Sequence, residues 1–528
     1  MTPTNRLLDR RTFLLGGGAL FLAACSSSSS TGTAADPTAD SASGTTGELA
    51  GAASTTVVPA STTASGTAAS TGAGTVARQA LWIPPAVTGP TFDLRLAPAS
   101  KQLFDGAATA TYGYNGADFW GPTLIMNKGD TVVLNVTNEL DEITTTHWHG
   151  FHIPPEMDGG PHQTIAAGAT WSPTFEVMND ASTYWYHPHM HETTWKQMNL
   201  GAGGLIIVQD DVEGALALPR AYGVDDIPLV LTSRKFGADN AIDTTGIYGD
   251  VMLTNGTRDA EVSLPAQLVR FRLLNAEIER VYDLGFDDDR TFHVIGTDGG
   301  LVNEPVPVTR LLLAPGERYE IVVDLGVDPV GHELSMQAFN GGQPFGFPGG
   351  EPNQDGTFGS LLNDTTFDVL HIVVGAATAD AVTSLPATLA ANVYWTAADA
   401  SGERTIEIND DGPGTPFRFG DHGYEMDTID QRVTLDATER WTIVNGHTFS
   451  HSFHIHDVQF SVVSRSTGAV PAYEQGWKDT VYVFKDETVS FVARFADFAS
   501  TEHPFMYHCH MSNHEDEGLM GQFLVVPA

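Results

Sequence analysis

The chain has 528 residues, with 26 basic and 65 acidic side chains and a formal charge of −39. So negative a chain is unsuited to nucleic acid, which proteins bind by neutralising phosphates with Lys and Arg, or to electrostatic docking on anionic lipid. The length suffices for about three domains. Its two cysteines exclude a disulfide-rich scaffold, so the 19 histidines are the feature to explain.

The N-terminus carries the pattern of an export signal. Arg10 and Arg11 precede an apolar run that ends at Ala24 and is too short to span a bilayer. Residues 1–24 resemble a twin-arginine signal peptide, and the residues before Cys25 resemble a lipobox, after which Cys25 would be the lipidated first residue. An ordinary signal with Cys25 incidental is the alternative. We expect an exported, extracytoplasmic lipoprotein on the cell surface, anchored in the membrane only through the lipid on Cys25.

Residues 25–79 form a predicted tether behind this signal. Ser, Thr, Ala and Gly dominate the stretch, and large apolar residues are almost absent. Such a composition buries too little surface to offset the entropy of ordering, so we expect a flexible linker. Glycosylation of its Ser and Thr residues is an alternative that the sequence leaves open.

From residue 80 onward, short β-rich runs are broken by turn residues about every 8–12 positions, which is typical of β-sandwiches and barrels. An alternating strand that ends in Asn recurs three times, at 129–138, 268–275 and 439–445. Each repeat closes on an apolar strand, at 204–208, 320–324 and 522–526. Repeats of this length indicate tandem domains. We place the three domains at 80–222, 223–380 and 381–528.

Four histidine clusters lie in this body, two in the first predicted domain and two in the last. Each contains His-x-His, and strand side chains two residues apart point to the same face. Imidazole suits copper, zinc, iron and nickel, and a thiolate among imidazoles favours copper or zinc. One pair alone would indicate ordinary hydrogen-bonded histidines, but four pairs predict a metal site between the first and last domains. The clusters are His147 and His149; His187 and His189; His451, His454 and His456; and His508, Cys509, His510 and His514.

The order and spacing of these clusters resemble the multicopper oxidase family over residues 80–528. The likeness is greatest to the bacterial three-domain group of copper-efflux oxidases, spore-coat laccases and bilirubin oxidases. It implies an all-β fold of three tandem cupredoxin-like Greek-key domains, with four copper ions per chain: one type 1, one type 2 and two type 3. Supporting segments are 157–161, 296–300, 315–318 and 476–480.

The resemblance also implies which side chains bind each copper. The type 1 copper would be held by His451, Cys509 and His514, the type 2 copper by His147 and His454, and the type 3 pair by His149, His187, His189, His456, His508 and His510. The family often has an axial Met five residues after the last type 1 ligand. That position is Leu519 here, and Met520 would replace it only if the loop shifted by one. We expect the non-coordinating Leu519 at the axial position, and with it a raised redox potential.

Two carboxylates match acids that the family places near its copper cluster. Asp158 and Glu515 would relay the protons that oxygen reduction consumes, because a positioned acid accelerates proton transfer. The alternative for each is a solvated loop carboxylate. His191 and His447 lie near the clusters and are candidates for contact with a ligand or a substrate.

The resemblance implies a laccase-like oxidase that takes single electrons from phenolic or similar donors and reduces O2 to water. An oxidase of Cu(I), Fe(II) or Mn(II) is the alternative. It is weakened because the 12 methionines form no Met-rich run, and because His447 stands where some of those enzymes have an acid. A copper-free cell-division scaffold is less expected, because every ligand position is filled. A copper nitrite reductase is less expected because it needs only two coppers and typically two domains per chain, which would leave the second and third His-x-His sets surplus. The oligomeric state is not readable from the sequence.

Overall fold

The computed structural model describes residues 78–354, 356, 358–410 and 417–528. This part of the chain consists mainly of strands, which confirms the predicted all-β class. No helix in it is long and apolar enough to cross a membrane. The predicted signal peptide and all but the end of the predicted tether lie outside it. Its helices are α1 (Thr194–Asn199), α2 (Asp211–Gly214) and α3 (Ser512–Asp516), with 3-10 turns at Pro155–Met157, Ala238–Asn240, Ala397–Asp399 and Ala472–Glu474.

We call the ranges 80–222, 223–380 and 381–528 the first, middle and third segments. Two sheets are built almost wholly from each segment, and the exception is β1 (Gln79–Ala80), which pairs with β15 of the middle segment. The first segment forms the sheets β2 (Ala86–Thr88), β5 (Thr123–Asn127), β11 (Gly204–Gln209), β10 (Ser182–His187), β7 (His147–His149), and β4 (Thr109–Tyr114), β3 (Thr91–Lys101), β6 (Thr131–Asn138), β8 (Thr170–Trp171), with β9 (Thr174–Glu176) also on β6.

The sheets of the other two segments follow the same plan. The middle segment forms β15 (Ala260–Pro265), β23 (Thr366–Gly375), β22 (Glu333–Phe339), β17 (Tyr282–Phe286), β20 (Leu311–Leu313), and β14 (Thr257–Arg258), β13 (Val251–Thr254), β12 (Asp226–Arg234), β16 (Leu268–Asn275), β21 (Arg318–Asp324), β18 (Phe292–Thr297), β19 (Gly300–Val308). The third forms β25 (Arg418–Phe419), β24 (Gly402–Asn409), β27 (Thr438–Asn445), β31 (Thr488–Arg494), β29 (Phe460–Arg465), and β26 (Gln431–Thr434), β33 (Met520–Val526), β32 (Phe505–Cys509), β28 (His451–Ile455), β30 (Thr480–Val483).

The recurring sequence pattern corresponds to recurring strands. The three predicted Asn-terminated strands are β6, β16 and β27, and the three closing strands are β11, β21 and β33. In β6 and β27 every second side chain is buried, as expected for a strand with one face on a core. β16 is buried along its whole length, because the first segment covers its second face through contacts such as that between Arg272 and Thr183. These strand predictions are confirmed, whereas the domain boundaries stay predictions.

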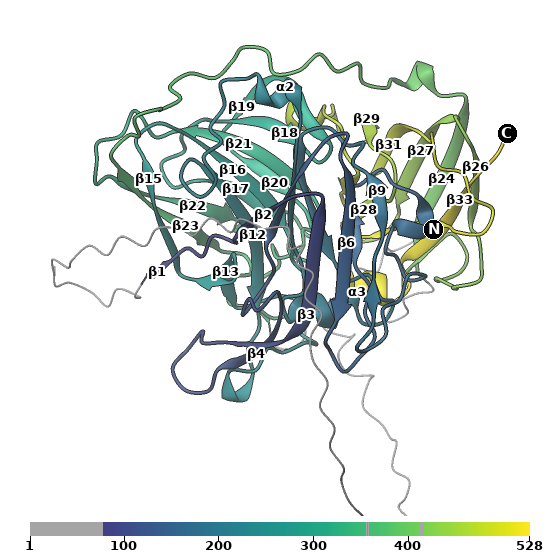
Figure 1. Ribbon diagram of the computed structural model, residues 1–528, viewed down its shortest axis with the longest axis horizontal. Helices are drawn as coiled ribbons and strands as arrows, with labels where there is room; N and C mark the ends of the chain where they lie inside the picture. The colour runs from purple at the N-terminus through teal and green to yellow at the C-terminus, as the bar shows by residue number, and fades with distance from the viewer. Residues whose placement is uncertain (1–77, 355, 357, 411–416) are drawn as a thin grey trace, which may run out of the picture.

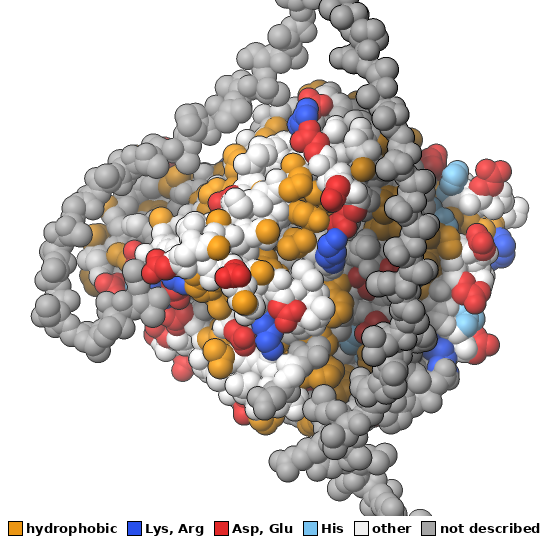
Figure 2. Space-filling model, turned by 90° about the horizontal axis from the view of Figure 1, so that it is seen from below, with side chains coloured by type: hydrophobic (Ala, Val, Ile, Leu, Met, Phe, Trp, Pro, Cys, Tyr) orange, Lys and Arg blue, Asp and Glu red, His pale blue; other side chains and the backbone are white. Residues whose placement is uncertain are grey.

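Each segment encloses a hydrophobic core of its own. In Figure 1 the strands of the middle segment lie on the left, those of the third segment on the right, and β3 and β6 of the first segment between them. Residues 376–396, which span the boundary of the middle and third segments, contain no helix or strand. Figure 2 shows acidic side chains spread over one face with a few basic ones among them, in keeping with the negative charge of the chain.

Candidate metal centre

Four strands bring the histidine clusters together at the contact of the first and third segments. In the first segment, β7 pairs with β10 so that His147 lies opposite His187. In the third, β28 pairs with β32 so that His454 lies opposite His508. All of the predicted ligands except His514, which is 5% exposed, are at most 1% exposed. The structure therefore gathers into one buried region residues that lie up to 367 positions apart, from 147 to 514.

Three imidazoles converge on one point. The Nε2 atoms of His189, His456 and His508 lie 3.1–3.3 Å from one another. Their Nδ1 atoms face outward to acceptors: that of His456 donates to Asp158 Oδ2 at 2.7 Å, and those of His189 and His508 lie 3.1 and 3.2 Å from Glu515. With the ring protons on Nδ1, three Nε2 lone pairs face each other.

This arrangement fits a metal ion. Three lone pairs so close repel one another unless a cation lies between them, and metal–imidazole bonds of about 2.0–2.1 Å place ligand nitrogens about 3.3–3.6 Å apart. Burial lowers the pKa of His456 well below its ordinary value, which keeps the ring in the neutral form that binds metals. The carboxylates at the outward nitrogens also match what is typical of metal-binding histidines, which donate their second ring N–H to an acid or a carbonyl.

The remaining histidines of the cluster surround this triad. In three of them the Nδ1 atom donates a hydrogen bond to a backbone carbonyl at 2.8–2.9 Å: His147, His187 and His454. Their buried Nε2 atoms have no hydrogen-bond partner, nor has either ring nitrogen of His510. Orphaned buried nitrogens are expensive unless they serve a ligand. The donor set therefore fits more than one metal ion.

Cys509 forms a second, separate site. Its Sγ lies 3.6 Å from Nδ1 of His451 and 3.6 Å from Nδ1 of His514. A sulfur with two imidazoles is the donor set of a blue copper centre. Burial raises the pKa of the Cys509 thiol to about 12, so a bound cation would be needed to displace its proton at neutral pH.

The sheet that carries β28 and β32 separates the two sites. Residues 451, 453 and 509 share the face that lines the core of the third segment, whereas 454 and 508 share the opposite face. His508 and His510 thus point to the histidine cluster while Cys509, between them, points away. The histidine cluster and the cysteine site lie on opposite faces of one sheet and are joined by adjacent residues.

Leu519 and Met520 take opposite faces as well. Met520 is the cross-strand partner of His508, so it shares the face of the histidine cluster. Leu519 packs in the core cluster that contains Cys509, and its carbonyl accepts a hydrogen bond from the Cys509 backbone N–H at 3.0 Å. In the described chain, the loop before β33 therefore does not have the shifted register that would place Met520 beside the Cys509 sulfur.

The predicted proton-relay acids are buried, not solvated. Asp158 and Glu515 are each 1% exposed. Burial alone would raise the pKa of Glu515, but the neighbouring His189 and His508 hold it well below its ordinary value. Asp158 contacts Nδ1 of His456, and Glu515 contacts Nδ1 of both His189 and His508. Both acids therefore lie on the outer side of the imidazoles, away from the converging Nε2 atoms.

Aromatic and acidic groups surround the cysteine site. The Phe417 ring lies 5.1 Å from that of His451, 4.4 Å from that of His514 and 4.8 Å from that of His447. His447 pairs with Asp410 at 3.0 Å. Glu279, of the middle segment, lies 3.7 Å from Nε2 of His514. His191, the other candidate, contacts the ring of Tyr424 and is not among the converging imidazoles.

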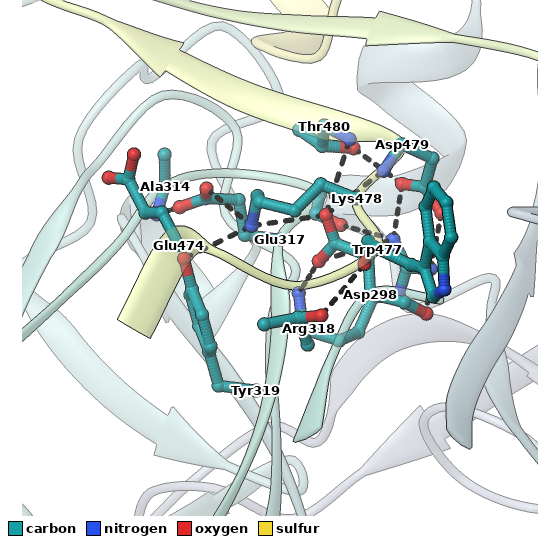
Figure 3. A network of polar contacts seen from close by, with 12 residues as sticks. Asp298, Ala314, Glu317, Arg318, Tyr319, Glu474, Trp477, Lys478, Asp479 and Thr480 are labelled. Carbon is teal, nitrogen blue, oxygen red and sulfur yellow. Dashed lines mark hydrogen bonds and ion pairs between the residues drawn. The ribbon is translucent and has the colours of Figure 1, made fainter. Parts of the chain in front are cut away.

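Among the charged residues that sequence reasoning missed, two contact the histidine cluster: Asp479 directly, and Arg318 through Asp479. Asp479 Oδ1 lies 3.1 Å from Nε2 of His149, and both Asp479 oxygens accept hydrogen bonds from Arg318 at 2.6 Å (Figure 3). The signal was present, because both stand in the segments 315–318 and 476–480 that support the family likeness. Without coordinates, nothing tied those segments to the histidines.

Comparisons with known proteins agree with this geometry. Three models described as multicopper oxidase match residues 98–213, 241–337 and 397–528. The multicopper oxidase mco of Staphylococcus haemolyticus is 28% identical over 82% of this chain and 88% of its own length. The cell division protein FtsP of Sodalis glossinidius is 34% identical over 80% of this chain and 86% of its own length.

A solved structure is similar over the same range. It is a laccase-like multicopper oxidase, CueO, from the lignin-degrading bacterium Ochrobactrum sp., described as active towards lignin model compounds and lignosulfonate. The TM-score is 0.74 at 33% identity, and the match covers 84% of this chain and 100% of that one. The likeness confirms the predicted architecture of three cupredoxin-like domains.

Proposed function

The chain belongs to the multicopper oxidase family and is an oxidase, and from that premise we propose that it is laccase-like. Four bound copper ions would supply one-electron chemistry: the cysteine site would accept single electrons from a phenolic or similar donor, and the histidine cluster would be where O2 is reduced, with four electrons and four protons, to two molecules of water. The type 1 copper would be held by His451, Cys509 and His514. The cluster would be held by the eight remaining histidines of the predicted set.

The convergence of unpaired imidazole nitrogens carries this proposal. Nitrogens 3.1–3.3 Å apart, with their outward partners in place, are arranged for metal and for little else. A copper-free scaffold would have no use for them, although several of the relatives are cell division proteins. Cys509 of the cysteine site is joined by one peptide bond to His508 and by another to His510, both of the histidine cluster. These two short covalent routes support electron transfer between the sites.

The chain's own side chains prepare both sites. Asp158, Glu515 and Asp479 orient imidazoles and keep their protons on the outward nitrogens. Asp158 and Glu515 would also hold protons within reach of the cluster. Leu519, which cannot coordinate, would leave the cysteine site with three ligands, and we propose that this raises its redox potential.

Aromatic contacts at the cysteine site support a phenolic donor. Phe417 lies against both of its histidines, and an aromatic donor would find ring surfaces there. The alternative, a metal oxidase, is favoured by one observation: the Glu279 carboxylate lies 3.7 Å from His514 Nε2, where it would attract a cation. The acidic surface would steer cations in the same direction.

Copper content and oxygen uptake test the proposal together. We expect purified, copper-loaded protein to be blue, to hold about four copper ions per chain, the number that the predicted ligand set would bind, and to consume oxygen faster with a methoxyphenol than with Cu(I). Faster uptake with Cu(I), corrected for its spontaneous oxidation, would establish the metal oxidase instead. A protein that takes up no copper would overturn the proposal and leave the scaffold.

We further propose that the protein is exported as a lipoprotein anchored through Cys25. The twin-arginine pattern and the Ala-Ala-Cys ending support this. Mass spectrometry of the N-terminal peptide from membranes tests it. A diacylglyceryl-modified Cys25 is expected, and a mature chain that starts at another residue would refute the anchor.

A further inference from the structure

We infer that Arg318, a residue of the middle segment, is a positioning residue for the copper cluster: through Asp479 it fixes which nitrogen of His149 faces the metal. The inference rests on the proposed function, because it concerns copper held by the cluster. It assigns a role at the metal centre to the segment that supplies no histidine ligand.

His149 is turned the other way from its neighbours. The other histidines of the cluster that make hydrogen bonds at Nδ1 present Nε2 to the interior. His149 instead places Nε2 against Asp479, at 3.1 Å, and leaves its buried Nδ1 without a partner. Its metal-facing atom is therefore Nδ1, and this orientation needs an acceptor that takes the Nε2 proton.

Asp479 is that acceptor, and it also contacts a second ligand. Its backbone carbonyl accepts a hydrogen bond from His454 Nδ1 at 2.8 Å. The rings of His149 and His454 stack with centroids 3.8 Å apart. One residue thus sets the orientation of two imidazoles, one from the first segment and one from the third.

Arg318 in turn fixes Asp479. Its two terminal nitrogens each donate to one carboxylate oxygen at 2.6 Å, in a bidentate pair. Its other three donors bind the carbonyls of Thr183, Gly316 and Asp298, at 2.9–3.1 Å. All five guanidinium donors are used, and they reach all three segments. Lys has three donors and no planar fork, so it cannot reproduce this arrangement.

A second group of charged residues holds the segment that contains Asp479 in place (Figure 3). Asp298 accepts hydrogen bonds from the backbone N–H groups of Asp479 and Thr480, at 3.2 and 3.3 Å. Lys478 lies between Asp298 and Glu317, at 3.1 and 3.0 Å. Space is equally constrained, since a Cβ on Gly150 would lie 2.5 Å from Asp479 Oδ2 and 2.6 Å from Arg318 Nη2. The residue after His149 therefore has to be Gly.

A merely structural ion pair would affect both copper sites alike, whereas a positioning residue affects the cluster alone. The test compares Arg318→Lys with Arg272→Lys. Arg272 is a matched control, because it is buried in the adjacent strand and forms a bidentate pair with Asp226 at 2.8 Å without contacting a histidine. Copper-loaded proteins are exposed to increasing concentrations of a chelator, the blue absorption reports the cysteine site, and total copper gives the cluster by difference.

We expect Arg318→Lys to lose cluster copper at chelator concentrations about 10–100-fold lower than the unmodified protein does, the usual effect of removing a partner behind a metal ligand. The blue absorption should persist as in the unmodified protein, and Arg272→Lys should retain both kinds of copper. Equal retention in the two variants, or loss of the blue absorption in step with cluster copper, would overturn the inference.

A second variant covers the case in which Arg318→Lys does not fold. Asp479→Asn keeps the side-chain shape and removes the charge that directs His149, and we expect the same selective loss. The double variant should lose no more cluster copper than the more severe of the two single variants, because both changes act through one carboxylate. An unmodified protein that binds no copper overturns the proposed function itself, whereas a copper-loaded protein insensitive to these changes overturns only the role of Arg318.

Discussion

His152 connects the first and third segments beside the metal centre, and its charge should make the stability of the protein depend on pH. Its Nδ1 lies 2.7 Å from Asp457 Oδ1, and its Nε2 lies 3.1 Å from Asp497 Oδ2. Its ring also packs against that of Phe498, with centroids 4.8 Å apart. The two carboxylates belong to the third segment, so the imidazolium bridges the interface on which the copper cluster depends.

The magnitude follows from the pKa. Burial alone would lower the pKa of His152, but Asp457 and Asp497 raise it from 6.5 to about 9. The difference corresponds to about 3 kcal/mol. Because the folded pKa is the higher one, this contribution is complete below a pH of about 6.5 and is lost as the pH rises through about 9. The pKa of Asp457 is raised by burial to about 6, so this acid still titrates at the lower end of the range, and the slope that reports His152 is taken above about pH 7.

Urea unfolding of copper-loaded His152→Gln between about pH 6 and 10 measures the effect. The free energy of unfolding should be lower than that of the unmodified protein by up to about 3 kcal/mol near neutral pH, and the gap should close above about pH 9. His332→Gln is the control. The His332 side chain is 39% exposed, and its Nε2 lies 3.6 Å from Asp328 Oδ1, so this is a surface pair of little energetic consequence. A gap that stays constant with pH would refute the reasoning.

Three further predictions concern the metal sites. Asp158→Asn should slow oxygen uptake by about 100-fold, the scale of a positioned acid, and leave the blue absorption in place; unchanged turnover would rule out the relay. Leu519→Met should lower the potential of the blue site in a redox titration, because Met can coordinate; an unchanged potential would place another residue at the axial position. Gly316→Ala should destabilise the protein by about 2 kcal/mol or more and reduce its copper content, because φ is +86° and a Cβ would lie 2.6 Å from the His510 ring; full copper retention would show that the ring can move aside.

The grouping of the histidines was predictable because strand geometry is local. His-x-His places two imidazoles on one face of β7, whatever the rest of the fold does. The same alternation turns Cys509 away from His508 and His510. The pairing of β28 with β32, which brings residues 55 positions or so apart into register, came only with the structure.

The charged residues behind the ligands were not predictable in the same way. Arg318 and Asp479 lie 161 positions apart, and each is one charged residue among 91 in the chain. Nothing in the local pattern distinguishes a buried bidentate pair from two solvated side chains, since the difference lies in the packing of three segments. For the same reason the sequence could not exclude that Asp158 and Glu515 are solvated loop carboxylates. Both are buried where the first and third segments meet, and that contact is seen only in the structure.

The interface location of the cluster has a consequence for folding. In the triad of converging nitrogens, His189 belongs to the first segment and His456 and His508 to the third, so neither segment can hold the triad alone. Copper that binds the assembled cluster but not the separate segments stabilises the interface by mass action. Removing copper should therefore weaken the contact of the first and third segments before it affects the core of either one, and His152 and Arg318 are among the charged residues that hold this contact in the copper-free protein.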